Sequence, residues 1–189
     1  MKKKLVLGIT GASSVIYGIR FLEVVKQIAE IESHLVLSAG AQATMRLETD
    51  WEVEKVRALA DQVWEENDLT APISSGSHPV IGMVVLPMSM KTMAAIAHGY
   101  DDNLIARAAG VQLKEGRKLI LCPRETPMHQ GHLRNMLELS QMGAVILPPM
   151  PAFYQKPQSI EDLIDHTVGK ILDQFKIDHQ LFNRWGVKK

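Results

Sequence analysis

The feature that most constrains this chain is a regular alternation between short apolar runs and longer segments with helical periodicity. The apolar runs occupy residues 4–10, 32–37, 82–87, 118–123 and 143–148. Such runs, without alternating polar residues, are typical of parallel strands covered on both faces. Residues 14–29, 103–114, 129–142 and 159–175 repeat apolar side chains every three to four positions, which predicts helices. The alternation therefore predicts an α/β fold in three layers, with a mostly parallel sheet between two layers of helices.

Residues 51–78 do not fit this alternation, because they are polar and indicate only a short helix and a loop. A length of 189 residues suits one hydrophobic core, and neither a repeat nor a linker divides the chain. We therefore expect residues 1–189 to form a single domain.

Charge and composition argue against several classes of protein. Lys and Arg number 21, and so do Asp and Glu, so a nucleic-acid partner is not expected. No apolar run approaches the ~20 residues of a membrane helix, and the first residues lack the apolar region of a signal peptide. A single cysteine excludes an intramolecular disulfide. We expect a cytoplasmic protein with no membrane partner.

Polar residues follow the predicted strands where those strands end. Pro87, Pro123 and Pro148 should end the pairing, since proline has no N–H to donate. The polar residues beyond these positions include Ser89, Lys91, Thr92, Arg124, Glu125 and Tyr154. Ligands of open α/β sheets bind beyond the carboxyl ends of the strands, so these residues are expected to share a site. The alternative is that they are ordinary polar loops.

The first strand ends in a turn of small residues, Gly-Ala-Ser-Ser at 11–14. Small residues at the start of a helix allow backbone amides to approach an anion. The pattern matches neither G-x-G-x-x-G nor G-x-x-x-x-G-K-[ST]. Together with Lys91 and Arg124, this turn favours the phosphate of a mononucleotide.

Motifs along nearly the whole chain form a specific set. They are GITGAS (8–13), LET (47–49), SSGS (74–77), LPMSMKT (86–92), LKEGRKLILCPRETP (113–127), PPMPAFY (148–154), LDQF (172–175) and RW (184–185). PRETP followed by PPMPAFY at this spacing is the most specific pair. The set resembles the UbiX-type flavin prenyltransferases, and within them most closely the members associated with phenolic and hydroxyarylic acid decarboxylase operons.

This resemblance implies a function. The family transfers a dimethylallyl group from dimethylallyl monophosphate or diphosphate to N5 and C6 of reduced FMN. The product, prenylated FMN, serves a UbiD-type aromatic acid decarboxylase. The resemblance also implies a Rossmann-like or flavodoxin-like fold, a dodecameric homo-oligomer and no metal. Two alternatives remain: an FMN-dependent decarboxylase that acts directly on an aromatic acid, and a non-catalytic flavin-carrying subunit of a decarboxylase.

The resemblance also assigns site residues. Those expected to bind FMN are Gly11, Ala12, Ser13, Ser38, Ser89, Met90, Lys91, Thr92 and Arg124. Those expected to bind the prenyl phosphate are Arg107, Lys114, Arg124, Tyr154, Lys170 and Trp185. Ser13, Glu48 and Glu125 are expected to handle protons, and either glutamate can accept the proton that leaves C6 of the flavin.

Two positions depart from the family pattern. Lys170 stands where many members carry Arg, and lysine keeps the charge but lacks the bidentate fork. Helical spacing puts Lys170 at the edge of the apolar stripe, from which it can reach a pocket. Ser14 stands where glycine is common, and we expect it to cap the first helix.

Three further residues have simpler interpretations. His129 and His132 have helical spacing but no evident third ligand, so we expect no metal there. Cys122 is expected to be a small buried side chain rather than a nucleophile.

Overall fold

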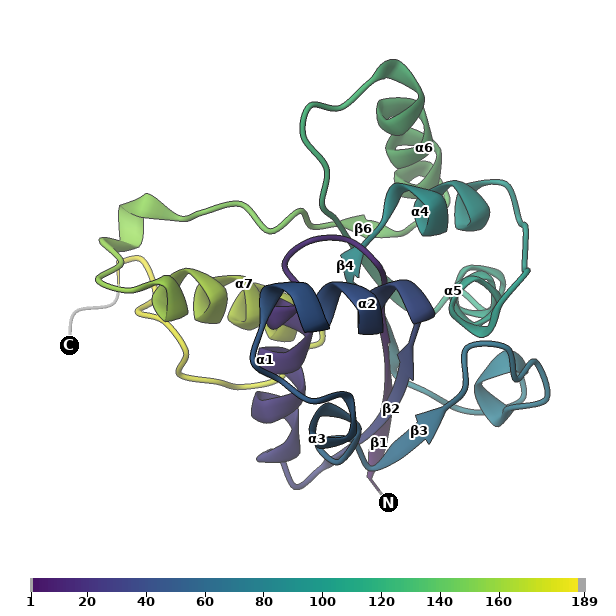
Figure 1. Cartoon of the computed structure of the whole chain (residues 1–189), viewed down its shortest axis with the longest axis horizontal. Helices are drawn as coiled ribbons and strands as arrows, with labels where there is room; N and C mark the ends of the chain where they lie inside the picture. Colours follow the sequence, from purple (N-terminus) through teal and green to yellow (C-terminus); the bar gives the residue numbers. More distant parts are fainter. Residues whose placement is uncertain (1, 187–189) are drawn as a thin grey trace.

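The computed structural model describes residues 2–186, in which a central sheet lies between two layers of helices (Figure 1). Its strands are β1 (Lys3–Ile9), β2 (Ile31–Leu37), β3 (Gln62–Trp64), β4 (Gly82–Met88), β5 (Lys118–Pro123) and β6 (Val145–Ile146). All neighbouring strands are parallel, in the order β3-β2-β1-β4-β5-β6. The predicted three-layer α/β fold with a parallel sheet is confirmed.

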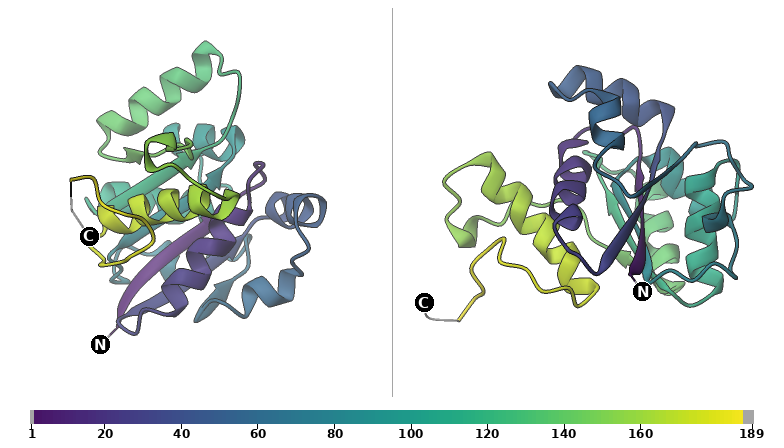
Figure 2. Two further views of the ribbon diagram at one scale, coloured as in Figure 1. Left: turned by 90° about the vertical axis from the view of Figure 1, so that its left-hand side faces the viewer. Right: turned by 90° about the horizontal axis from the view of Figure 1, so that it is seen from below.

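The helices cover both faces of the sheet, as Figure 2 shows in two further views. They are α1 (Ile16–Lys26), α2 (Ala39–Glu48), α3 (Val53–Arg57), α4 (Met90–Ala97), α5 (Leu104–Lys114), α6 (Gln130–Gln141) and α7 (Ile160–Gln174), with 3₁₀ turns η1 (Pro72–Ser74) and η2 (Phe153–Gln155). Side chains alternate across β1: Leu5 and Leu7 pack with α1 and α7, whereas Val6 packs with α4 and α5. Burial on both faces explains why the strands are continuously apolar.

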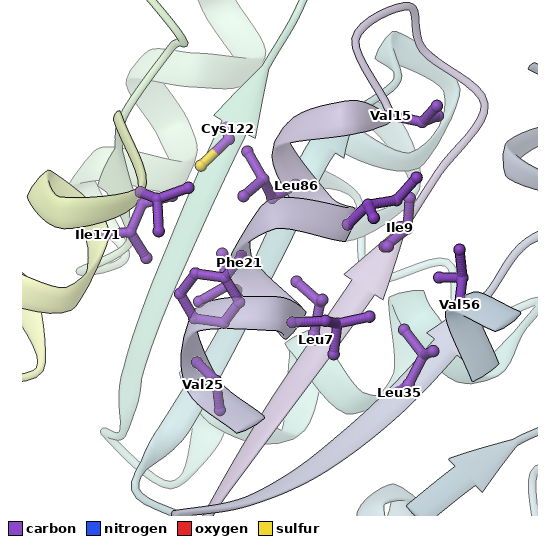
Figure 3. Close-up of a cluster of buried hydrophobic side chains, with 14 of the residues drawn as sticks. Leu7, Ile9, Val15, Phe21, Val25, Leu35, Val56, Leu86, Cys122 and Ile171 are labelled. Carbon is purple, nitrogen blue, oxygen red and sulfur yellow. The ribbon is translucent and has the colours of Figure 1, made fainter. Parts of the chain in front are cut away.

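The core beneath α1 and α7 includes Phe21, Leu86, Cys122 and Ile171 (Figure 3). Cys122 is fully buried, and burial raises the pKa of its thiol far above the ordinary value. A thiol that stays protonated is a poor nucleophile, which agrees with the interpretation of Cys122 as a core residue.

Sequence reasoning missed one strand and two helices. Strand β3, which pairs with the edge of β2, lies within residues 51–78, where a helix and a loop were expected. Helices α2 and α4 were not predicted either. Both are short, with ten and eight residues, and both directly follow a strand.

One proline prediction needs correction. Strand β4 continues through Pro87 to Met88, and a register shift lets Met88 pair with Pro123 of β5. Pairing of β4 with β1 does end before the proline, at Val85. The irregularity explains how a proline is accommodated near the end of an inner strand.

The order of the strands reverses between β1 and β4, which are neighbours although β2 and β3 come between them in sequence. In open α/β sheets such a reversal leaves a crevice beyond the carboxyl ends of the two strands. Within residues 2–186, no helix combines the length and the apolar character that a bilayer crossing requires.

Candidate functional site

The carboxyl ends of β1 and β4 are joined by Thr10. Its Oγ1 donates a hydrogen bond to the carbonyl of Pro87 at 2.9 Å and accepts one from the backbone N–H of Ser89 at 2.7 Å. The side chain is buried. Thr10 therefore fixes the loop after β1 against the start of α4, a role that sequence reasoning did not assign to it.

A cavity of about 410 Å³ opens beyond these strand ends. We call it the switch-point pocket, and its lining residues are Gly11, Ser38, Ala39, Gly40, Glu66, Asn67, Ser89, Lys91, Thr92, Asp102 and Asn103. Five of the residues expected to bind FMN thus lie together here: Gly11, Ser38, Ser89, Lys91 and Thr92.

Three helices begin at the switch-point pocket. Ser38 caps α2 by accepting from Ala41 N at 2.9 Å, and Ser89 caps α4 by accepting from Thr92 N at 3.3 Å. Asn103 caps α5 in the same way. Each helix N-terminus carries partial positive charge, so their convergence suits a phosphate.

Two glycines bring the backbone of the turn after β1 into direct contact with the first turn of α2. A Cβ on Gly11 would lie 2.9 Å from Cα of Gly40, a distance that real Cβ atoms do not reach. The turn after β1 therefore touches the first turn of α2, and a side chain at Gly11 would separate them. Gly40 was not predicted, because the contact joins segments far apart in sequence.

Acidic residues also line the switch-point pocket, and sequence reasoning did not identify them. Glu66 accepts a hydrogen bond from the backbone N–H of Ala39 at 2.7 Å, in the first turn of α2. Asp102 lies 3.9 Å from Nζ of Lys91, whose side chain is 79% exposed. Lys91 is therefore free to turn toward an anion in the pocket.

Glu48 and Ser13 are brought to the same turn. Glu48 is the last residue of α2, and its Oε2 accepts a hydrogen bond from the backbone N–H of Ser14 at 2.7 Å. Ala12 is buried next to them. Two of the three residues expected to handle protons therefore lie at one place.

The expectation that Ser14 caps the first helix is wrong. Val15 occupies the N-cap position of α1, and no side chain caps it. Ser14 instead has a φ of 81°, in the left-handed region that favours glycine. Its backbone N–H is directed to Glu48, which explains why this conformation is held.

Arg124 and Glu125 lie in a second cavity of about 460 Å³, between the loops that follow β5 and β6. The backbone N–H of Arg124 donates to the carbonyl of Met88 at 3.2 Å, which places this loop beside the end of β4. Glu125 accepts from the N–H of Thr126.

Met90, at the start of α4, is half-buried against the apolar core.

Tyr154 and Trp185 meet at a third place, beside α7. Their rings are 6.0 Å apart and nearly perpendicular. The Tyr154 hydroxyl lies 2.9 Å from Nε2 of His166, a residue of α7 that was not predicted. Lys170 follows one turn later and is 46% exposed, at the edge of the apolar face as expected.

The segment 178–185, which we call the C-terminal strap, runs back along α7 (Figure 1). Asp173 binds the strap: its carboxylate accepts from Arg184 at 2.7 and 3.1 Å and lies 3.1 Å from Nε2 of His179. The Arg184 bonds hold the pKa of Asp173 below its usual value. Gly169 leaves room for the strap, because a Cβ there would lie 2.6 Å from His179 and Phe182.

Within one chain, Arg107 and Lys114 line neither the switch-point pocket nor the cavity at Arg124. Arg107 donates to the carbonyl of Ser74 and to Asp101, both at 3.0 Å. Lys114 pairs with Glu115 at the far end of α5, about 15 Å along the helix from the switch-point pocket. Their role in prenyl-phosphate binding stays a prediction.

His129 has a structural explanation. Its Nδ1 accepts from the backbone N–H groups of Gly131 and His132, so the side chain caps α6. Among residues 2–186, no group of three His, Cys, Asp or Glu side chains is placed to hold a metal ion.

Comparison with known proteins identifies the family. The Flavoprotein family model matches residues 1–173. The UbiX flavin prenyltransferase of Escherichia coli is 52% identical over 97% of this chain and 98% of its own length.

Two solved structures share the whole fold. The crystal structure of AnUbiX in complex with FMN and dimethylallyl pyrophosphate matches with a TM-score of 0.97 and 50% identity, covering 100% of both chains. A dodecameric FMN-dependent UbiX-like decarboxylase from Escherichia coli matches with a TM-score of 0.95 and 47% identity, over 97% of this chain and 100% of its own. Since the identity is near one half along nearly the whole length, the chain belongs to the UbiX-type flavin prenyltransferases, a family of transferases.

Proposed function

We propose that the protein transfers a dimethylallyl group from dimethylallyl monophosphate or diphosphate to N5 and C6 of reduced FMN. The prenylated FMN would serve a UbiD-type aromatic acid decarboxylase. The observation that carries the proposal is the switch-point pocket, where α2, α4 and α5 begin beside Gly11 and Lys91. The crystal structure of the relative AnUbiX, which holds FMN and dimethylallyl pyrophosphate, supports it.

The switch-point pocket suits the phosphate end of FMN. The first N–H groups of α4 can donate to phosphate oxygens, whereas those of Ala39 in α2 and Leu104 in α5 are engaged by Glu66. The partial positive charge of the three helix N-termini and the full charge of Lys91 also favour an anion. Gly11 and Gly40, which both line the pocket, present backbone rather than side chains there. FMN supplies the nucleophilic flavin ring, and the protein supplies position and charge.

Tyr154, Lys170 and Arg124 are proposed to bind the prenyl phosphate. Breaking the allylic C–O bond leaves negative charge on the phosphate, which positioned cations and hydroxyl groups stabilise. The allyl fragment becomes cation-like, and each aromatic face attracts a cation by about 0.5–2 kcal/mol. Trp185, 83% exposed and in edge-to-face contact with Tyr154, is available for that role.

Glu48 is our preferred acceptor for the proton that leaves C6, and Glu125 is the alternative. Glu48 lies next to the turn expected to bind the flavin, where it accepts from Ser14 N. Glu125 lies in the separate cavity beyond β5. Neither step uses a metal ion in our proposal.

We further propose a homo-oligomer, a dodecamer, acting in the cytoplasm as one FMN-binding domain per chain. In one chain the predicted site residues fall in separate places: the switch-point pocket, the cavity at Arg124 and the α7 surface at Tyr154. Assembly with neighbouring copies would allow these parts to combine. The dodecameric relative from Escherichia coli supports this part of the proposal.

An anaerobic incubation with reduced FMN and dimethylallyl monophosphate tests the function. A prenyltransferase yields a flavin heavier by one dimethylallyl group in mass spectrometry. Release of carbon dioxide from an aromatic acid without a partner protein would instead indicate a direct decarboxylase. Binding of FMN with neither reaction would indicate a flavin carrier.

A further inference from the structure

His166 is a buried polar side chain to which the proposed reaction assigns no role. It is 8% exposed and lies in the middle of α7. Its Nε2 and the Tyr154 hydroxyl oxygen are 2.9 Å apart, and the two rings meet edge to face at an angle of 89°. Phe182 of the C-terminal strap packs against the imidazole, with ring centroids 4.7 Å apart. The imidazole is therefore held in a fixed orientation between Tyr154 and the strap.

The groups around His166 favour the neutral form of its imidazole. Burial lowers its pKa most, and the positive charge of Lys170, one turn along α7, lowers it further. Asp173 acts in the opposite direction, but its carboxylate is engaged by Arg184 and His179. A neutral imidazole carries one N–H donor and one acceptor nitrogen, so its tautomer decides what it can offer to Tyr154.

A bound phosphate determines which tautomer is compatible. Phosphate oxygens only accept hydrogen bonds at full ionisation, so the Tyr154 hydroxyl must give its one proton to the phosphate. Its remaining lone pairs can then be satisfied by a donor, and Nε2–H of His166 stands at the right distance. With the opposite tautomer, Tyr154 would donate to His166 and have no proton left for the substrate.

We propose that His166 is a positioning residue for prenyl-phosphate binding, which holds the Tyr154 hydroxyl by an Nε2–H donor so that its proton points to the phosphate. This inference rests on the proposed function. His166 does not line the switch-point pocket and its neutral imidazole carries no charge. It acts on recognition of the allylic phosphate only through Tyr154.

The neighbouring Lys170 explains why a hydroxyl held in a fixed direction is useful in this chain. His166 and Lys170 are four positions apart on α7 and so share one face of the helix. Lysine offers a point charge without the planar fork of arginine, so it attracts the phosphate but orients it poorly. A fixed Tyr154 hydroxyl supplies the missing direction.

Three variants of the full-length protein test the inference. His166→Phe keeps an aromatic ring against Phe182 and removes the hydrogen bond, and we expect it to raise KM for dimethylallyl monophosphate about five- to tenfold. His166→Gln keeps an N–H donor of similar reach and should restore KM to within about threefold of wild type. Tyr154→Phe combined with His166→Phe should be no worse than Tyr154→Phe alone, because both remove the same interaction. His98→Phe, at an exposed histidine that follows α4, is the control.

The FMN dissociation constant and Tm of each variant are measured alongside KM. Unchanged FMN affinity with the raised KM and its rescue by glutamine supports the inference. It is overturned if His166→Phe leaves KM unchanged, if glutamine rescues nothing, or if the two substitutions are additive.

Calorimetric binding of dimethylallyl monophosphate to the wild-type protein loaded with oxidised FMN separates the two proposals. If the wild type neither binds this compound in calorimetry nor forms prenylated flavin from reduced FMN, the proposed function fails and the inference fails with it. If the wild type does both while the His166 variants behave like the control, the inference about His166 alone is wrong.

Discussion

The switch-point pocket and the Tyr154 region hold predicted site residues by different means. In the switch-point pocket, helix N-termini, a buried threonine and a glycine–glycine contact determine the geometry through the backbone. In the Tyr154 region, side chains determine the geometry: one tyrosine–histidine hydrogen bond, an edge-to-face aromatic contact and the ion pairs of Asp173. In our proposal, the flavin therefore binds a preformed site, whereas the prenyl phosphate binds a site that depends on single side chains.

Substitution of Gly11 should break the preformed site most severely. In Gly11→Val the new Cβ would meet the backbone of Gly40, which cannot yield as a flexible side chain would. We expect FMN affinity to fall about 100-fold and the free energy of unfolding to fall by about 1–3 kcal/mol, as for other overpacked sites. Fluorescence titration with FMN and urea unfolding measure the two effects. Ala43→Val, at an exposed position of α2, is the control, and equal losses in both variants would contradict the role of Gly11.

Substitution of Glu48 should separate flavin binding from chemistry. Glu48→Gln keeps an oxygen that can accept from Ser14 N, so the turn and FMN affinity should be preserved. Loss of the proton acceptor should lower kcat by about 10²–10⁴-fold. Anaerobic single-turnover kinetics of flavin prenylation measure this, with Glu125→Gln in parallel. Unchanged turnover in Glu48→Gln would remove Glu48 from the mechanism.

Substitution of Tyr154 should affect the prenyl phosphate far more than the flavin. Tyr154→Phe removes the hydroxyl that lies beside His166 and keeps the edge-to-face contact with Trp185. We expect KM for dimethylallyl monophosphate to rise about tenfold, in line with a hydrogen bond to a charged group. FMN affinity should stay within about twofold of wild type, since Tyr154 does not line the switch-point pocket, which is proposed to bind FMN. Equal losses of both affinities would show that the two regions are not independent.

The C-terminal strap should detach from α7 at acid pH. The pKa of Asp173 is held below its usual value of 3.8 in the folded protein, so its contacts contribute stability above that value. The contribution is lost as the pH falls through the lowered folded-state pKa. Limited proteolysis of the strap and Tm, followed from neutral to acid pH, measure the loss.

Asp173→Asn provides the comparison for the pH experiment. At neutral pH it should release the strap and lower Tm by a few degrees, because Arg184 and His179 lose their charged partner. At acid pH the variant and the wild type should converge. A constant difference between them at every pH would contradict the assignment to Asp173.

The smallest expected effect is a gain in stability at the turn after β1. Ser14 has a φ of 81°, which glycine adopts without strain. Ser14→Gly should raise the free energy of unfolding by about 0.5–1 kcal/mol, partly offset by the greater freedom of glycine in the unfolded chain. Urea unfolding measures it. A clear loss of stability would mean that the serine side chain makes a contact that outweighs the strain.

The sequence predicted the parts of the fold that depend on local patterns. The apolar runs of β1, β2, β4 and β5 were predicted within one or two residues, because strands covered on both faces leave a continuous signal. Strand β3 was missed, since three residues at the edge of a sheet carry almost no pattern. The cap expected at Ser14 was wrong, because the long-range bond to Glu48 decides that turn.

The same division holds for the candidate site. Residues within motifs, such as Gly11 and Ser89, were predicted and lie in the switch-point pocket. Gly40, Glu66 and Asn103 were missed, because their relation to the pocket arises only when β1, β2 and β4 align. His166 left one local signal, a histidine within the apolar stripe of α7, but its contact with Tyr154 joins two separate elements.

One measurement tests the central claim most directly: the mass of the flavin after anaerobic incubation of the wild-type protein with reduced FMN and isotopically labelled dimethylallyl monophosphate. We predict that the label appears in the flavin as one added dimethylallyl group, with inorganic phosphate released in equal amount. An unmodified flavin, with the label remaining in the phosphate ester or in free dimethylallyl alcohol, would contradict the proposed function.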